Sequence, residues 1–297
     1  MFDFCCQSLQ TEVFVRQNDH SMTTMKQSRL KRFRTVGTDI FVFVAIFILV
    51  QLVVSLILYS CLDGMRNSSG TLTDYGFCLS YLCYMVPTLI LVTRYESVRY
   101  KCSMPIKSAW RGFDPTMVLW GFILLVSTSI ALSPIKELFP ASERALPLGG
   151  WTLVAVCVLA PVFEEIIFRG RLFSMLHHSV GALSSAVITA LLFGLVHGDP
   201  RTMVEGFMAG MIFSYLYIRK GSIIAPILVH ACNNAIAYAM IVLSYQNKSV
   251  GEILGENVNM TIVYIVSVVV MLVGFAVVIR TLRRYGAERC SSISNEQ

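Results

Sequence analysis

Apolar runs long enough to cross a bilayer recur about eight times along this chain of 297 residues. A helix rises ~1.5 Å per residue, so roughly 20 apolar residues cross a hydrocarbon core of ~30 Å. The composition agrees, because 55% of the residues are hydrophobic, 14% are charged and the mean hydropathy is +0.66. These values fit no class of soluble protein. We therefore predict an all-α, polytopic membrane protein that folds in lipid.

The breakers between the apolar runs predict eight transmembrane helices. We expect them near residues 40–62, 75–93, 116–132, 151–168 and beyond, 182–197, 203–218, 222–245 and 260–280. No repeat or low-complexity stretch separates domains, so one helical membrane domain is predicted between two tails. The predicted boundaries are 1–38 for the polar N-terminal tail, 39–284 for the membrane domain, 151–245 for its motif-bearing core and 285–297 for the C-terminal tail.

The basic residues are distributed unevenly between the two sides of the predicted bundle. Eight helices place both termini on one side, and the tails and connections on that side carry 19 of the 24 Lys and Arg residues. The opposite connections carry 5. By the positive-inside rule both termini are cytoplasmic. The basic residues form no continuous patch, so we expect the lipid bilayer and no nucleic acid as a partner.

The nine cysteines give no sign of a disulfide framework. They are odd in number, scattered along the chain and without a C-x-x-C pair. We therefore expect reduced, buried thiols that act as soft apolar side chains. The sequence carries no signal for the oligomeric state.

Ionisable side chains inside the predicted helices are concentrated between residues 164 and 234, and such residues are costly in lipid. In helix four, Arg169 follows Glu165 by four residues, which places both on one face and predicts an ion pair. Glu164 points ~100° away and has no partner in its own helix, so it is available to accept a proton. The alternative is that both glutamates only anchor the helix at the interface.

Two further helices carry histidine. Phe193 and His197 lie one turn apart at the end of helix five, and His230 and Asn234 share a face of helix seven, with Asn233 beside them. Each set alone could simply hold helices together. Together with the unpaired glutamate they supply a general base, a second proton-handling group and donors for an oxyanion. This inventory indicates the addition of water to a carbonyl group, at a site among helices four to seven.

The ordered motifs E-E-x-x-x-R, F-x-x-x-H and H-x-x-x-N resemble those of the CPBP family of intramembrane endopeptidases, also called the CAAX protease and bacteriocin-processing, or Abi, family. The resemblance covers roughly 95 of the 297 residues. It implies a polytopic peptidase that cuts a peptide or protein substrate at the membrane. The matching positions are Glu164, Glu165, Arg169, Phe193, His197, His230 and Asn234.

The resemblance also implies a role for each matching residue. Glu164, helped by His197, would activate a water molecule. His230 and Asn234 would stabilise the oxyanion, and the Glu165–Arg169 pair would hold the site together. Relatives cut after a prenylated cysteine or process small peptides, and the sequence does not select between these substrate classes.

A metal-dependent reaction is an alternative that the sequence leaves open. His197, His230 and Glu164 are residue types that ligate zinc, but no H-E-x-x-H motif is present. A glutamate and a histidine can activate water without a metal, so we favour a site that needs no metal or other cofactor.

Two other functions are also compatible with polar residues in membrane helices. A proton-coupled transporter would be expected to carry such residues in both halves, yet the first three predicted helices have almost none. A non-catalytic immunity or scaffold protein would have no chemical reason to retain Glu164, His197, His230 and Asn234. A peptidase is therefore the favoured hypothesis.

The peptidase hypothesis places a geometric demand on helix four. If it ended at Phe168, Glu164 and His197 would lie ~20 Å apart in depth and could share no water. A helix that continues from about Trp151 to His177 removes the conflict. The turn from Gly198 to Arg201 would then line a hydrated pocket, since irregular backbone within a membrane needs protein or water around it.

The topology predicts which side of the membrane each connection faces. Single cysteines introduced near Arg99 should react with an impermeant maleimide only after the cytoplasmic side is exposed, because 19 of 24 basic residues lie on that side. Labelling of these cysteines from the outside would contradict the eight-helix topology.

Overall fold

The structure of the chain, a computed structural model, describes most residues between Arg34 and Ser294. The described ranges are 34–60, 63–67, 70–101, 113–140, 146–245, 248–255 and 257–294. Most of the predicted N-terminal tail and part of the 94–115 connection lie outside them. The first helix already begins at Arg34, within the predicted tail.

Helices make up all the regular secondary structure of the described residues, apart from one isolated bridge between Arg66 and Leu72. The long helices are Arg34–Ser60, α2 (Asp74–Tyr100), α3 (Pro115–Lys136), α6 (Ser174–Leu195), α7 (Pro200–Lys220), α8 (Ile224–Val242) and α10 (Met260–Ser294). The short elements are η1 (Asp63–Met65), α4 (Gly150–Val154), η2 (Ala155–Leu159), α5 (Ala160–Glu165), η3 (Ile166–Phe173) and α9 (Val250–Leu254). Within the described ranges, 6 helical stretches are long and apolar enough to cross a membrane. The predicted all-α, polytopic membrane fold is confirmed.

Predicted helices four and five lie in one helical stretch of 46 residues, Gly150–Leu195, which runs from α4 through α6. The backbone leaves helical geometry at Gly181, where φ is 77° and ψ is 172°, a conformation that costs glycine little. The continuous helix expected from Trp151 to His177 is therefore confirmed. Predicted helix six corresponds to α7, which is not among the 6 apolar stretches.

Two buried carboxylates correct the expectation that the first three helices carry almost no ionisable residues. The first two helices extend beyond their predicted ends and include Asp39 and Glu96, both 0% exposed. Asp39 accepts hydrogen bonds of 2.6 Å from Tyr95 and from Tyr100. Glu96 pairs with Arg171 of η3 at 2.7 Å. Each carboxylate is thus compensated inside the protein, as burial requires.

The cysteine prediction holds in part. The four cysteines whose side chains the structure describes are all free thiols. Cys78 is buried, and Cys83 and Cys157 are partly exposed, but Cys232 is exposed. Burial is therefore not shared by all of them.

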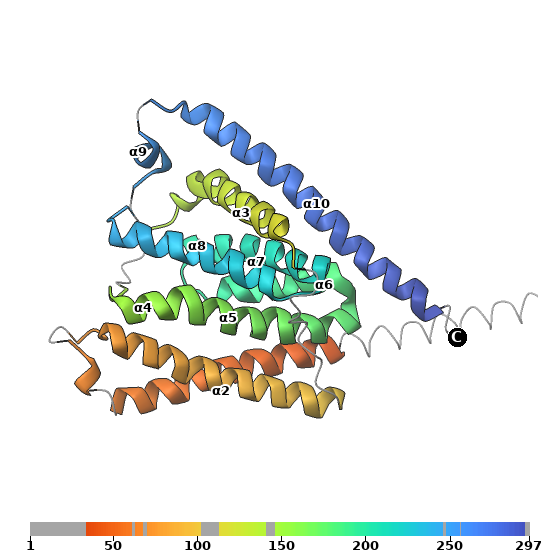
Figure 1. The fold of residues 1–297 in the computed structure, drawn as a ribbon. Coiled ribbons are helices and arrows are strands. Elements are labelled where there is room, and N and C mark those ends of the chain that lie inside the picture. The colour runs from red at the N-terminus through yellow and green to blue at the C-terminus, as the bar shows by residue number, and fades with distance from the viewer. Residues whose placement is uncertain are drawn as a thin grey trace, which may run out of the picture.

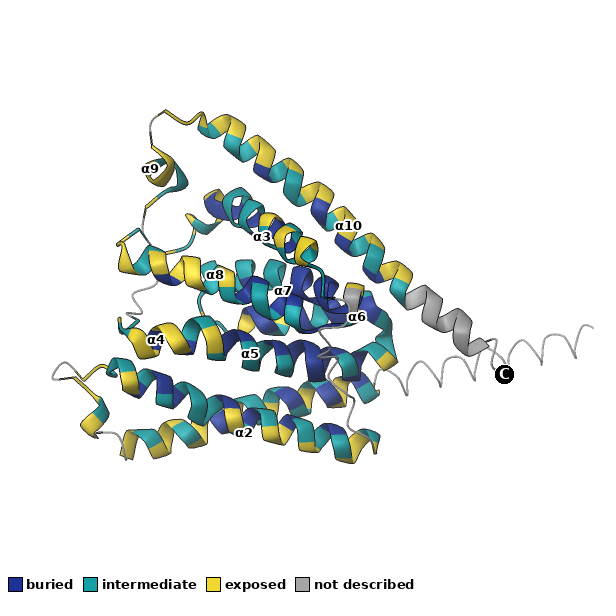
Figure 2. Ribbon diagram, viewed as in Figure 1, coloured by how far each residue is buried: buried dark blue, intermediate teal, exposed yellow. Residues whose placement is uncertain are grey.

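The Gly150–Leu195 stretch runs through the middle of the bundle (Figure 1). The Arg34–Ser60 helix and α2 lie on one side of α5, and α8 lies on the other. The long helix α10 crosses the outside of α3, α6 and α7. Buried residues gather on η3, α6 and α7, while α8 and α10 expose much of their surface (Figure 2). The best-packed part of the bundle therefore contains two of the motif residues, Arg169 on η3 and Phe193 on α6.

Glycines allow α6 and α7 to approach each other closely. A Cβ atom added to Gly194 would lie 2.5 Å from the backbone oxygen of Met203, and one added to Gly210 would lie 2.8 Å from the Cα of Ala190. Small residues at such spacings let the backbones of membrane helices touch. This contact brings the carbonyl of Gly210 within reach of the motif residues on η3.

Substitution of Gly194 should destabilise the fold. Gly194→Ala is expected to cost about 1–3 kcal/mol, because the backbone of Met203 cannot move aside as a flexible side chain could. Gly37→Ala is the control, since this exposed helical glycine has nothing within 4 Å and alanine favours helix. Thermal unfolding of the purified variants in detergent measures the difference. Equal midpoints would contradict the tight packing of α6 on α7.

Candidate active site

The helix that carries the two glutamates is wider than an α-helix on both sides of them, because α5 lies between the π-helical segments η2 and η3. In a π-helix each N–H donates to the carbonyl five residues earlier. Pro161 has no N–H, so the carbonyl of Val156 lacks this donor. Asn234 of α8 supplies the missing donor, because its Nδ2 donates a hydrogen bond to the Val156 oxygen at 2.9 Å. The irregular helix therefore positions Asn234.

Arg169 and Glu165 form the predicted ion pair, which the structure confirms. Nη1 of Arg169 lies 2.8 Å from Oε1 of Glu165, and both side chains are 0% exposed. Nη2 of Arg169 donates to the carbonyl of Gly210 at 3.2 Å. The guanidinium also lies over the rings of Phe193 and Phe213, 4.5 and 5.1 Å from their centroids. The buried cation is thus surrounded by a carboxylate, a carbonyl and two aromatic faces.

His230 is held by the same buried carboxylate. Its Nδ1 lies 3.0 Å from Oε1 of Glu165, and because a carboxylate only accepts, Nδ1 carries the proton. The ring is 3% exposed and stacks on Phe213, with centroids 5.0 Å apart. These contacts fix the imidazole so that Nε2 points to Glu164, whose Oε2 lies 3.8 Å away.

Glu164 has a partner that the sequence does not indicate. The hydroxyl of Tyr81 on α2 donates to Oε1 of Glu164 at 3.0 Å. The two residues are 83 positions apart, and an uncharged tyrosine in an apolar run carries no motif signal. With Oε1 engaged, Oε2 is the oxygen that faces His230. The side chain of Glu164 is 15% exposed, whereas that of Glu165 is fully buried.

His197 lies at the other edge of the site. Its Nδ1 is 2.7 Å from the carbonyl oxygen of Phe193, so the ring donates this bond. The Phe193 ring contacts both histidines, with centroids 5.0 Å from His197 and 5.6 Å from His230. His230 therefore lies beside Glu164, with Nε2 and Oε2 3.8 Å apart.

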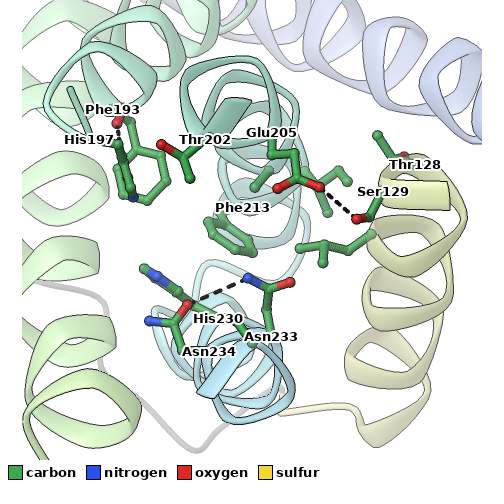
Figure 3. Close-up of a pocket in the computed structure, with 15 residues that line it drawn as sticks. Thr128, Ser129, Phe193, His197, Thr202, Glu205, Phe213, His230, Asn233 and Asn234 are labelled. Atoms are coloured by element: carbon green, nitrogen blue, oxygen red, sulfur yellow. Dashed lines mark hydrogen bonds between the residues drawn. The ribbon is translucent and has the colours of Figure 1, made fainter. Parts of the chain in front are cut away.

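A pocket of ≈ 190 Å³ opens between α3, α7 and α8 next to these residues (Figure 3). His197, His230 and Asn234 line it, so three of the four predicted catalytic residues face one space. Glu164 is not among the lining residues, but its Oε2 lies 3.8 Å from Nε2 of His230, which is one of them. The lining residues are Leu125, Thr128, Ser129, Phe193, His197, Thr202, Glu205, Gly206, Ala209, Ile212, Phe213, His230, Asn233, Asn234 and Ala237.

The donors in the site do not form a metal-binding set. Within the part of the chain that the structure describes, no three His, Cys, Asp or Glu side chains are grouped so that they could hold a metal ion. Nδ1 of His230 faces Glu165 and Nδ1 of His197 faces the Phe193 carbonyl.

Replacement of Glu165 tests its structural role. Glu165→Gln should lower the stability by about 3–5 kcal/mol, because it leaves Arg169 as an uncompensated charge at a site with no exposure. Glu164→Gln is the matched control, since its side-chain carbonyl can still accept the Tyr81 hydrogen bond. Thermal unfolding in detergent should separate the two variants. A destabilised Glu164→Gln beside a stable Glu165→Gln would reverse the assignment.

Comparison with known proteins supports the relationship that the motifs suggest. Residues 147–236 match the family model of the type II CAAX prenyl endopeptidase Rce1-like proteins. YdiL of Bacillus subtilis, named as a membrane peptidase, is 30% identical over 97 residues, which are 33% of this chain and 38% of that protein. The membrane-embedded CAAX protease MroQ of Staphylococcus aureus is 26% identical over 133 residues, 41% of this chain and 53% of that protein.

Each of these matches covers less than half of the chain. An uncharacterized 24.3 kDa protein of Escherichia coli is 30% identical over 121 residues, 38% of this chain and 55% of that protein. The matches thus span about a third to just over half of the length of these relatives. No solved structure gives a significant match. Residues 147–236, which carry all seven motif positions, are thus similar to the type II CAAX prenyl endopeptidase Rce1-like family and to proteins named as membrane peptidases.

Proposed function

We propose that this chain is an intramembrane endopeptidase that hydrolyses a peptide bond with a water molecule activated by Glu164 and His230. The observation that carries the proposal is the distance of 3.8 Å between Oε2 of Glu164 and Nε2 of His230. This distance is too long for a direct hydrogen bond, yet it accommodates a water oxygen ~2.8 Å from both atoms. The exposed fraction of Glu164, 15%, lets water reach it.

In the proposed first step, Glu164 takes one proton of this water as the general base. Nε2 of His230 accepts a hydrogen bond from the other proton, since Nδ1 carries the ring proton. The water oxygen then forms a bond to the carbonyl carbon of the peptide. The family resemblance implies that His197 helps Glu164, and the distance of 3.8 Å supports His230 in this role.

The tetrahedral intermediate needs donors for its oxyanion. Asn234 is one candidate, because one of its amide protons is used by the Val156 carbonyl and the second remains. His197 is the other, since it lines the same pocket and the imidazolium form of its ring can donate from Nε2 while Nδ1 keeps its bond to the Phe193 carbonyl. When the C–N bond breaks, Glu164 returns its proton to the leaving amine. The products are a carboxylic acid and an amine, and Glu164 is again ionised.

The substrate class follows from where the site lies. The pocket is in a bundle of apolar helices, so a membrane-associated peptide or protein is the substrate that can reach it. One family name specifies prenylated CAAX proteins, and we propose a lipidated substrate only as one member of this wider class. The proposed orientation keeps both termini in the cytoplasm.

Two alternatives from the sequence remain distinct from this proposal. A non-catalytic immunity or scaffold protein would bind a peptide without cutting it. Binding alone does not require Glu164 to lie beside an oriented His230. A proton-coupled transporter would use buried carboxylates in both halves of the chain. Asp39 and Glu96 provide such groups, yet tyrosine and arginine side chains already engage them.

Replacement of Glu164 tests the peptidase proposal. Glu164→Gln in proteoliposomes should cut a pool of acylated peptides at least ~10²–10⁴-fold more slowly than the unchanged protein, because the general base is lost. Glu137→Gln, at an exposed position at the end of α3, should cut at the unchanged rate. Mass spectrometry of the products gives the rates. An unimpaired Glu164→Gln would contradict the mechanism, and absence of cleavage by all three proteins would favour the non-catalytic alternative.

A further inference from the structure

Two further polar side chains, Ser129 and Glu205, line the same pocket opposite His230 and Asn234, and the mechanism does not use them (Figure 3). Glu205 of α7 reaches toward α3, where Ser129 donates to its Oε1 at 2.6 Å. Nζ of Lys136 lies 2.5 Å from the same oxygen and 3.4 Å from the Ser129 hydroxyl oxygen. We call Ser129, Lys136 and Glu205 the α3–α7 cluster.

The charges in the α3–α7 cluster cancel. Glu205 and Lys136 are partly exposed, with side-chain exposures of 34% and 23%, and each neutralises the other. The contacts from Ser129 and Lys136 both go to Oε1 of Glu205, and Oε2 makes no hydrogen bond to a described residue. The cluster therefore offers the pocket a hydrogen-bond acceptor without a net charge.

Asn233 adds a second acceptor to the pocket. Its Nδ2 is directed at Oδ1 of Asn234, 3.5 Å away. Its own Oδ1 makes no hydrogen bond to a described residue, and the side chain lines the pocket with Glu205. A ligand in this space thus meets two unused acceptors beside the apolar side chains of Leu125 and Ile212.

We propose that the α3–α7 cluster and Asn233 bind a side chain of the substrate that donates hydrogen bonds and carries no charge, such as the amide of Gln or Asn or the hydroxyl of Ser or Thr. An acidic side chain would be repelled by Glu205, and a basic one would leave a net positive charge beside Lys136. A neutral donor satisfies the acceptors with neither cost. This inference rests on the proposed function, because it takes a peptide as the ligand of the pocket.

The test measures binding, so that it does not depend on catalysis. The full chain with Glu164→Gln is placed in nanodiscs and mixed with fluorescent, acylated decapeptide pools, in which one position at a time is fixed as Gln, Ser, Glu or Lys. At one position of the peptide, the pools fixed as Gln or Ser should bind about tenfold more tightly than the pools fixed as Glu or Lys. Cleavage of the same pools by the unchanged chain is measured separately. A failure of the peptidase proposal is therefore distinguished from a failure of the binding preference.

Two variants of opposite charge supply the matched control. Adding Lys136→Met should shift the preference at that position toward Lys, since it leaves the Glu205 charge unbalanced. Adding Glu205→Gln should shift it toward Glu, since it frees Lys136. Thermal unfolding shows whether each variant is folded. If only one variant folds, the change in its binding preference alone tests the inference. The inference is overturned if no position discriminates, if a charged residue binds best in the parent, or if the variants leave the ranking unchanged.

Discussion

The buried charge of Arg169 is the constraint on which the rest of the site depends. A guanidinium with no exposure in an apolar bundle needs compensation from every direction. Glu165 supplies it from the same helix, and Gly210 supplies a carbonyl because α7 can approach α6 so closely. The rings of Phe193 and Phe213 cover the cation. Glycine packing, aromatic residues and the ion pair are therefore parts of one arrangement.

The same arrangement orients the chemistry. Glu165 shares one oxygen between Arg169 and His230, which turns Nε2 of His230 toward Glu164. Tyr81 holds the other side of Glu164, so the carboxylate is directed from two helices. Hydrogen bonds of this kind are how buried polar groups select one geometry for a catalytic residue. The π-helical distortion around α5 contributes in the same way, by freeing the carbonyl that positions Asn234.

Contacts within one helix were predictable from the sequence, and contacts between distant helices were not. Helical spacing was sufficient to pair Glu165 with Arg169, and the requirement for a common depth predicted the long helix through His177. Tyr81, Glu205 and the buried Glu96 and Asp39 left no such signal, because their partners lie on other helices and depend on packing. The same reason explains why the sequence could not tell which histidine lies beside Glu164.

The orientation of His230 can be measured through the protonation of its two ring nitrogens. Solid-state NMR of ¹⁵N-histidine-labelled protein in bilayers, with His230→Asn to assign the signal, distinguishes the two ring nitrogens. We expect a protonated Nδ1, hydrogen-bonded to Glu165, and an unprotonated Nε2. A proton on Nε2 with a bare Nδ1 would contradict this expectation, because His230 could then neither donate to Glu165 nor accept the water that Glu164 activates.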